Sequence, residues 1–394
     1  MRLLKIILKN AIAFGGPVEL TFNTSDGVRV SALHSEHDML AYKVQKGVYT
    51  QVMMGVIGAN ATGKTTVLEI ISLVLHIVFG HQKPNFPEAH RILNKLMPKN
   101  EGINWEVYFI AGNKIYLLES EIQKNAAGTF EFKKECLRSK ALKSTSGSAL
   151  YDFSSCEIQT RENYKTNSLF KNDTTIAEAA IPGEYQGRIF SMESAVNHNS
   201  PYWQGRPDTR LINCFDPNIE DIIIETEGSP VANKMQVSFK NQNIECVGNS
   251  LVLGNFLSSG TVKGLSLLPG VIEVLKHGGY LIVDELENHF NKKIVEWFLE
   301  LFSDVRTNPH GACLVFSTHY PEILDFFRRK DNIYVTRREK DNFLGCIRFS
   351  DEIKRNDISK SNVILANVIK GTAPSFKDVD NATKCIIDYV SKEM

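Results

Sequence analysis

The stretch VMMGVIGANATGKTTVLEIISLVLHIVFG, from 52 to 80, decides the fold class of this chain. Its centre, GANATGKT at 58–65, fits the pattern GxxxxGK[ST] of phosphate-binding loops. The apolar run before it, 52–57, is typical of a buried strand, and the apolar residues after it recur at helical spacing as far as Gly80. Because a strand precedes the loop and a helix follows it, a chance match in a glycine-rich turn is the poorer interpretation.

Each residue type in this loop has a physical task. Glycines let the backbone curl so that its N–H groups face phosphate oxygens, and the start of the helix adds a partial positive charge. We expect Lys64 to neutralise the β- and γ-phosphates of ATP and the Thr65 hydroxyl to ligate Mg²⁺. The residues expected to bind the nucleotide in this loop are Gly58, Asn60, Ala61, Thr62, Gly63, Lys64, Thr65 and Thr66.

A pair of carboxylates follows an apolar run at YLIVDE, 280–285. An apolar strand would deliver both acids at its carboxyl end, where α/β folds bind ligands. We expect Asp284 to be a Mg²⁺ partner, direct or through water, and Glu285 to polarise the attacking water. Taken alone, the run could be a strand ending in a solvated turn. Its occurrence together with the phosphate-binding loop favours the catalytic interpretation.

Two further motifs flank this pair. LSSGT at 257–261 lies about 20 residues before the acids and opens a helix expected over 262–275, so it would form a second anion site at a helix N-terminus. The alternative is a serine cap on an ordinary helix. After the acids, the apolar run ACLVF leads into STH, 317–319. A lone histidine is more often structural, but His319 ends the strand that follows the acidic pair.

The order of these four motifs resembles the heads of ABC-type ATPases of the RecF, SMC and OLD-like group, and the resemblance spans about residues 1–350. LSSGT resembles their LSGGQ-type signature in its Ser-Gly-Thr version, departing at the third and fifth positions. The resemblance implies that His319 is a switch histidine and that the stretch LENHF, 286–290, is a loop crossing to a partner subunit. Asn288 and His289 in this stretch would contact the opposite site. The alternative for Asn288 is that it caps a helix. It also implies that the γ-phosphate of ATP on the other subunit is bound by Ser258, Ser259, Gly260 and Thr261.

A finer resemblance is to compact prokaryotic defence ATPases, including RloA, abortive-infection ATPases and the AriA subunit of PARIS systems. Three segments carry it: LLKIILKNAIAF at the start, FDPNIEDI and the tail NVILANVIKGTAP. It implies a homodimer or higher homo-oligomer closed around ATP, and regulation of a separate nuclease or toxin in anti-phage defence. No fused nuclease is expected. The family also has a Mg²⁺-binding glutamine, for which Gln82, Gln123 and Gln159 remain equal candidates.

The fold class expected is α/β: an ABC-type head with a mixed central sheet, an N-terminal antiparallel β-subdomain and an inserted, mostly helical subdomain. The antiparallel part is predicted from alternating strands around a turn at Gly112, with a further strand at FEFKKECL. The chain divides into an N-terminal lobe (1–137), the insert (138–215) and a C-terminal lobe (216–394). The order of strands and helices in the C-terminal lobe predicts a parallel sheet.

Composition sets the limits of function. The 394 residues carry 45 basic and 45 acidic side chains, so no overall positive field draws the chain to nucleic acid. Seven scattered cysteines without CxxC spacing indicate reduced thiols and no zinc site. No apolar run reaches the roughly 18 residues that span a bilayer, and we expect a cytoplasmic protein without a signal peptide. A basic run at 133–143 leaves a RecF-like DNA-binding ATPase as the alternative, although a solvated helix or loop face is the better interpretation of the run. A non-hydrolysing scaffold is a third alternative.

Overall fold

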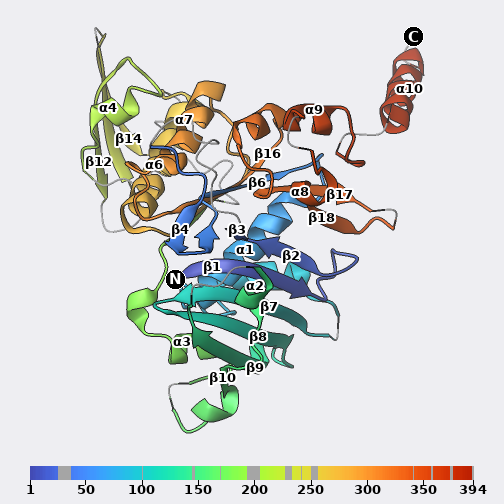
Figure 1. Ribbon diagram of the computed structural model, residues 1–394. Helices are drawn as coiled ribbons and strands as arrows, with labels where there is room; N and C mark the ends of the chain where they lie inside the picture. The colour runs from blue at the N-terminus through green and yellow to red at the C-terminus, as the bar shows by residue number, and fades with distance from the viewer. Residues whose placement is uncertain are drawn as a thin grey trace.

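The computed structural model describes residues 1–24, 37–99, 101–143, 147–168, 170–192, 205–226, 233–240, 242–249, 256–339, 341–355, 358–372 and 376–392. They form a mixed α/β molecule with several sheets, as expected. A mostly parallel central sheet occupies the upper part of Figure 1, and a large antiparallel sheet lies below it.

The central sheet brings together strands from distant parts of the chain. In spatial order they are β11 (Ile189–Met192), β15 (Tyr280–Val283), β16 (Cys313–Thr318), β6 (Met53–Ile57), β17 (Ile333–Arg338) and β18 (Leu344–Arg348). All neighbours are parallel except β17 and β18. β6, β15 and β16 are buried along their whole length, because elements cover both faces of the sheet. Their carboxyl ends therefore meet at one edge.

Alternating side chains of the central sheet enter two separate cores. On one face, Met54 and Val315 pack with helix α1 (Lys64–Val78) and with the antiparallel sheet. On the other face, Met53 and Leu314 pack with α6 (Ser259–His277) and α7 (Lys292–Ser303). The predicted helix after the phosphate-binding loop is confirmed. The helix expected over 262–275 is also confirmed, and it is longer at both ends.

The predicted antiparallel region is confirmed as a six-stranded sheet. In spatial order its strands are β10 (Glu157–Thr160), β9 (Phe130–Ala141), β8 (Lys114–Lys124), β7 (Ile103–Ala111), β1 (Arg2–Lys9) and β2 (Val18–Thr21). The hairpin between β7 and β8 turns at Gly112, whose φ of 56° suits glycine. Helix α2 (Pro87–Leu96) contributes Ile92 and Leu93 to the same core.

The segment 138–215 differs from the mostly helical insert expected. In its described residues the helices are short, of one turn or little more: η2 (Gly147–Tyr151), η3 (Arg161–Tyr164), α3 (Ile176–Ala180), η4 (Gly183–Tyr185) and α4 (Thr209–Ile212). β9 and β10 belong to the antiparallel sheet, and β11 is a strand of the central sheet. The four-residue strand IFSM is too short to show a period, so neighbouring strands decide its structure. The Ser- and Asn-rich stretches 144–146 and 197–200 lie outside the described residues.

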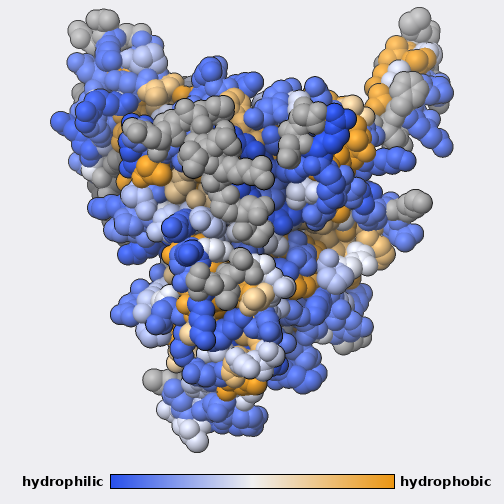
Figure 2. Space-filling model, in the orientation of Figure 1, coloured by the Kyte–Doolittle hydropathy of each residue, from blue (hydrophilic) through white to orange (hydrophobic). Residues whose placement is uncertain are grey.

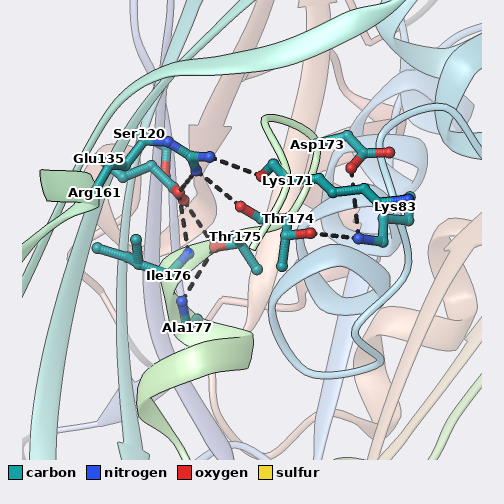
Figure 3. Close-up of polar contacts among 10 residues, drawn as sticks. All are labelled: Lys83, Ser120, Glu135, Arg161, Lys171, Asp173, Thr174, Thr175, Ile176 and Ala177. Carbon is teal, nitrogen blue, oxygen red and sulfur yellow. Dashed lines mark hydrogen bonds and ion pairs between the residues drawn. The ribbon is translucent and has the colours of Figure 1, made fainter. Parts of the chain in front are cut away.

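A buried polar network holds this segment against β9 (Figure 3). Glu135 is fully enclosed and accepts hydrogen bonds from the Arg161 guanidinium at 2.5 Å, Thr175 Oγ1 at 2.7 Å and the Ile176 N–H at 3.0 Å. The carboxylate therefore satisfies the first N–H of α3 and balances the charge of the Arg161 guanidinium. A buried ion pair such as that of Glu135 and Arg161 is stable only when its other donors and acceptors are also hydrogen-bonded.

The remaining elements frame the upper part of the molecule. β12 (Ile219–Thr226), β13 (Asn233–Phe239) and β14 (Gln242–Asn249) form a small sheet whose core includes residues of α6. A second small sheet contains β3 (Asn23–Thr24), β5 (Val48–Thr50) and β4 (Tyr42–Gln45). The C-terminal elements are η5 (Pro321–Phe326), α8 (Phe349–Glu352), α9 (Lys360–Leu365) and α10 (Phe376–Lys392). The tail NVILANVIKGTAP, 362–374, which carries part of the resemblance, ends in residues outside the described part.

Helix α10 stands away from the rest of the chain in Figure 1, and Figure 2 shows hydrophobic side chains exposed along it. Val379, Ile386 and Tyr389 are all exposed. Across the described ranges, none of the helices combines the length and the apolar character needed to traverse a bilayer.

Candidate functional site

The loop predicted to bind phosphate, 58–65, connects β6 to α1 by a tight turn. Gly63 has a positive φ of 97°, a conformation that glycine adopts without steric cost, and Ala61 has a positive φ of 59°. A Cβ added to Gly58 would overlap the side-chain hydroxyl and the carbonyl oxygen of Thr336 on β17. The glycines are therefore required by the curl of this loop and by its close contact with the neighbouring strand.

Lys64 is the first residue of α1, and its side chain is folded back over the loop. Its ammonium group donates hydrogen bonds of 3.0 Å to the carbonyl oxygens of both Gly58 and Ala59. Burial lowers the pKa of Lys64, and the nearby carboxylate of Asp284 opposes that shift. The lysine thus occupies the concave side of the loop, where the first N–H groups of α1 are also directed.

Asp284 links the phosphate-binding loop to the end of β15. Its Oδ2 accepts a 2.6 Å hydrogen bond from Thr65 Oγ1, and its Oδ1 accepts one from Ser317 Oγ at the end of β16. A hydroxyl and a carboxylate at this separation are the oxygen ligands that Mg²⁺ takes alongside water and phosphate. Among the described residues, no cluster of three or more His, Cys, Asp or Glu side chains could hold a metal by itself.

Glu285 and His319 face each other across the ends of two adjacent strands. Glu285 Oε1 lies 3.3 Å from His319 Nε2, and both side chains are about one-third exposed, at 34% and 32%. The N–H of Glu285 donates to Ser317 Oγ at 2.8 Å. Glu285 has a positive φ of 49°, which is uncommon for a non-glycine residue and turns the chain sharply after the strand.

The LSSGT motif begins α6 as the sequence predicts. Ser258 caps the helix, its Oγ accepting the N–H of Thr261 at 3.1 Å, while Ser258 and Ser259 are exposed. A Cβ on Gly260 would lie 2.7 Å from the carbonyl oxygen of His289. The motif therefore packs against the loop that follows the acidic pair. Within the described ranges, no hydrogen bond or ion pair connects 258–261 to the phosphate-binding loop of the same chain.

Lys263, one turn into α6, is a site residue that the sequence did not reveal. Its ammonium group donates to three carbonyl oxygens in the loop after β15: those of Glu285 at 2.8 Å, Leu286 at 3.3 Å and Asn288 at 2.9 Å. It also lies over the Phe290 ring. Burial lowers its pKa to about 8. In the sequence, Lys263 could be noticed only as a charged residue among the apolar residues of the helix that follows LSSGT.

The alternative role for Asn288 as a helix cap is wrong. The N-cap of α7 is Asn291, whose side chain accepts the N–H of Lys293 at 2.9 Å. Asn288 instead belongs to the turn that Lys263 binds, and His289 next to it is exposed with a φ of 67°. Asn288 and His289 therefore remain available for the contact with a second subunit that the resemblance implies.

The three candidate glutamines for a Mg²⁺ ligand lie apart in the fold. Gln123 is on β8, bonded to Glu131, and Gln159 is on β10, where it accepts the hydroxyl of Tyr164. Both therefore belong to the antiparallel sheet. Gln82 follows α1, with its N–H bonded to the carbonyl of His76.

Most of the basic run at 133–143 lies on β9 of the antiparallel sheet, and three of its charged side chains face glutamates on β8. Lys133 and Lys134 both contact Glu121 on β8, and Arg138 contacts Glu119 at 2.8 Å. The groove of about 700 Å³ above these strands is lined by equal numbers of acidic and basic side chains. Lys133, Lys134 and Arg138 therefore form cross-strand ion pairs on a strand rather than on the helix or loop face expected, while Lys140 donates to the carbonyl oxygens of Ala149 and Asp152.

The fold thus gathers the loop 58–65, the acidic pair and His319 at one edge of the central sheet. No protein-family model matches this sequence, and no curated protein matches it. Among solved structures, an SMC head bound to the C-terminal winged-helix domain of ScpA is similar at 12% identity. The match covers 90% of this chain and 100% of that one, with a TM-score of 0.38. That score is too low to establish a common fold.

Proposed function

We propose that this chain is an ABC-type ATPase that binds Mg²⁺-ATP at the loop 58–65 and hydrolyses it to ADP and phosphate. The observation that carries the proposal is the 2.6 Å hydrogen bond between Thr65 and Asp284, which are 219 residues apart in sequence. It joins a glycine-rich anion-binding loop to a carboxylate at the end of a neighbouring parallel strand. This combination is what Mg²⁺-dependent phosphoryl transfer requires.

The loop residues bind and orient the triphosphate. Lys64 would exchange its two carbonyl partners for phosphate oxygens, which carry more charge and form stronger hydrogen bonds with an ammonium group. Backbone N–H groups of Thr62, Gly63 and Thr66 would donate to the same phosphates. Thr65 and Asp284 would hold Mg²⁺, which neutralises charge on the phosphates. Asn60 and Ala61 form the exposed rim of the loop.

Glu285 and His319 are the proposed catalytic residues. Glu285 would hold the attacking water and receive its proton, since its carboxylate is half-buried directly beyond the Mg²⁺ ligand. His319 would donate from its ring to the γ-phosphate. The 3.3 Å contact between the two side chains positions one beside the other before substrate arrives.

A second copy of the chain would complete each site. The signature residues Ser258, Ser259, Gly260 and Thr261 begin a 19-residue helix, so they can bind an anion, yet they contact the loop after β15 rather than their own phosphate-binding loop. We therefore propose an ATP-dependent homodimer or higher homo-oligomer. Asn288 and His289 would contact the opposite copy.

The wider role that we propose is regulation of a separate effector, a nuclease or toxin, in anti-phage defence. This part rests on the resemblance in the sequence. A RecF-like DNA clamp receives no support from the groove on the antiparallel sheet, because its basic side chains are neutralised by paired glutamates. Binding to duplex DNA that weakens steeply with salt would favour the clamp instead.

Phosphate release by the purified chain tests the proposal. Wild-type protein should hydrolyse ATP only with Mg²⁺, Lys64→Ala should lose binding, and Glu285→Gln should bind ATP without turnover. Exposed Lys276 at the end of α6 provides a control, Lys276→Met, that should match wild type. Specific activity should rise with protein concentration, and Glu285→Gln should form a dimer with ATP. Equal hydrolysis by wild type and Lys64→Ala would reject the proposal.

A further inference from the structure

Glu287 is a buried carboxylate that the proposed mechanism leaves without a task. It is only 6% exposed, and it lies two residues after Glu285 in the loop following β15. Its Oε1 accepts a 2.6 Å hydrogen bond from the backbone N–H of His319. Its Oε2 is buried and has no hydrogen-bond partner among the described residues. Removing a charged carboxylate from water costs free energy, so an apolar residue would be expected at this buried position unless the acid had a role.

Two glutamates therefore hold the same histidine from different sides. Glu287 binds the peptide N–H of His319, and Glu285 lies beside its ring at 3.3 Å. Residues of the same loop also contact Ser317, since the N–H of Leu286 donates to its carbonyl oxygen at 3.1 Å. The end of β16 is thus bonded to the loop after β15 through Ser317 and His319. The hydrogen bond that Glu287 accepts from the His319 N–H is one of these contacts.

The charges around Glu287 explain how the acid can be buried there. The electrostatic influence of Glu287 opposes the loss of a proton from both Lys64 and Lys263. For Lys263 it is the largest such influence. Glu287 thus lies in the field of two ammonium groups, one from the phosphate-binding loop and one from α6.

We propose that Glu287 is a positioning residue that holds His319 in register with Glu285 and the γ-phosphate. The expected effect on turnover rests on the proposed function. The hydrogen bond between Glu287 and the His319 N–H does not depend on that function. When Glu287 binds the backbone of His319, the turn after β16 cannot rotate, and the ring stays beside Glu285. Glu287 itself does not touch the reacting atoms, so its effect passes through His319.

Two substitutions separate the hydrogen bond from the charge. Glu287→Gln keeps an oxygen acceptor for the His319 N–H and should retain most of the turnover. Glu287→Leu removes the acceptor and should lower kcat at least tenfold, with the KM for ATP unchanged. The matched control is Glu322→Leu, an exposed glutamate three residues after His319, which should behave as wild type. Equal activity of Glu287→Leu and wild type would overturn the inference.

A double-mutant cycle distinguishes positioning from a general structural effect. If Glu287 acts through His319, Glu287→Leu should cause no further loss of turnover in a His319→Ala background. A full additional tenfold loss in that background would show that Glu287 acts elsewhere, and would overturn the inference. Thermal unfolding of both single variants confirms that the comparison is made between folded proteins.

A spectroscopic readout separates this inference from the proposed function. In protein labelled at the histidine ring carbons, the His319 signal is identified by its loss in His319→Ala. It should shift in Glu287→Leu, as the ring leaves Glu285, and stay in place in Glu322→Leu. An unmoved signal would reject the positioning role even in an active ATPase. A shifted signal in a protein without hydrolysis would retain that role and reject only the ATPase proposal.

Discussion

Replacing Lys263 with methionine removes an ammonium group that donates to three carbonyl oxygens, at 2.8, 3.3 and 2.9 Å, while conserving the volume of the side chain. These hydrogen bonds hold the loop 285–289, in which Glu285 and His289 have φ angles of 49° and 67°. We expect Lys263→Met to remain folded and to lose ATP hydrolysis.

The magnitude follows from the backbone of this loop. A non-glycine residue in the left-handed region costs roughly 1–2 kcal/mol, so Glu285 and His289 together cost about 2–4 kcal/mol. Lys263 supplies the interactions that offset this cost. Without it, the loop relaxes and the population with Glu285 in place falls. At about 1.4 kcal/mol per tenfold, hydrolysis should decrease by about 30-fold to about 1,000-fold.

Global stability should respond differently. Burial lowers the pKa of Lys263 from 10.5 to about 8, so keeping it charged in the folded state costs about 3 kcal/mol near neutral pH. Methionine has no such cost, and this gain opposes the loss of the three hydrogen bonds. The free energy of unfolding should therefore change by no more than about 1–2 kcal/mol in either direction, although activity falls steeply.

The assay compares phosphate release and denaturant unfolding for wild type, Lys263→Met and Lys276→Met, the last being an exposed lysine on the same helix. Nucleotide affinity, measured with a fluorescent ATP analogue, should be similar in all three. A folded Lys263→Met protein that hydrolyses ATP at the wild-type rate would refute the assignment of this lysine to the loop.

Four further predictions concern the phosphate-binding loop, the titration of Lys263 and the buried Glu135. Gly58→Ala should reduce ATP affinity at least tenfold by calorimetry, because the new Cβ overlaps Thr336; unchanged binding would contradict the packing described. As pH rises from 7 to 9, hydrolysis should fall with a midpoint near 8, since neutral Lys263 has one donor fewer. The contribution of Lys263 to unfolding free energy should rise from pH 8 to 10, because the unfolded chain binds more protons there; the difference between wild type and Lys263→Met measures it. Glu135→Leu should destabilise the protein by about 3–5 kcal/mol, because it leaves a buried guanidinium without its partner, whereas Glu162→Leu, at an exposed ion pair, should change the unfolding midpoint little.

Local sequence determined the elements that carry the site. The glycine spacing at 58–65 specifies the loop because Gly63 adopts a positive φ and Gly58 lies too close to Thr336 for a side chain, and the uninterrupted apolar runs specify β6, β15 and β16. The mixed α/β class and the hairpin of β7 and β8 follow from the same kind of periodicity.

Only the tertiary structure decided which strands pair and which side chains from different elements come into contact. β11 is four residues long and becomes a strand because β15 pairs with it, and Lys133, Lys134 and Arg138 of the basic run pair with glutamates on the adjacent strand. Likewise, nothing in the spacing of Lys263 or Glu287 indicates that they bind backbone atoms of the acidic loop and of His319. A side chain that bonds a distant main-chain atom produces no recognisable sequence pattern. Almost every residue carries the same main-chain N–H and C=O groups, so the partner's residue type gives no signal. The chemical groups of the site could therefore be predicted from the sequence, while their positioning depends on contacts that only the folded chain creates.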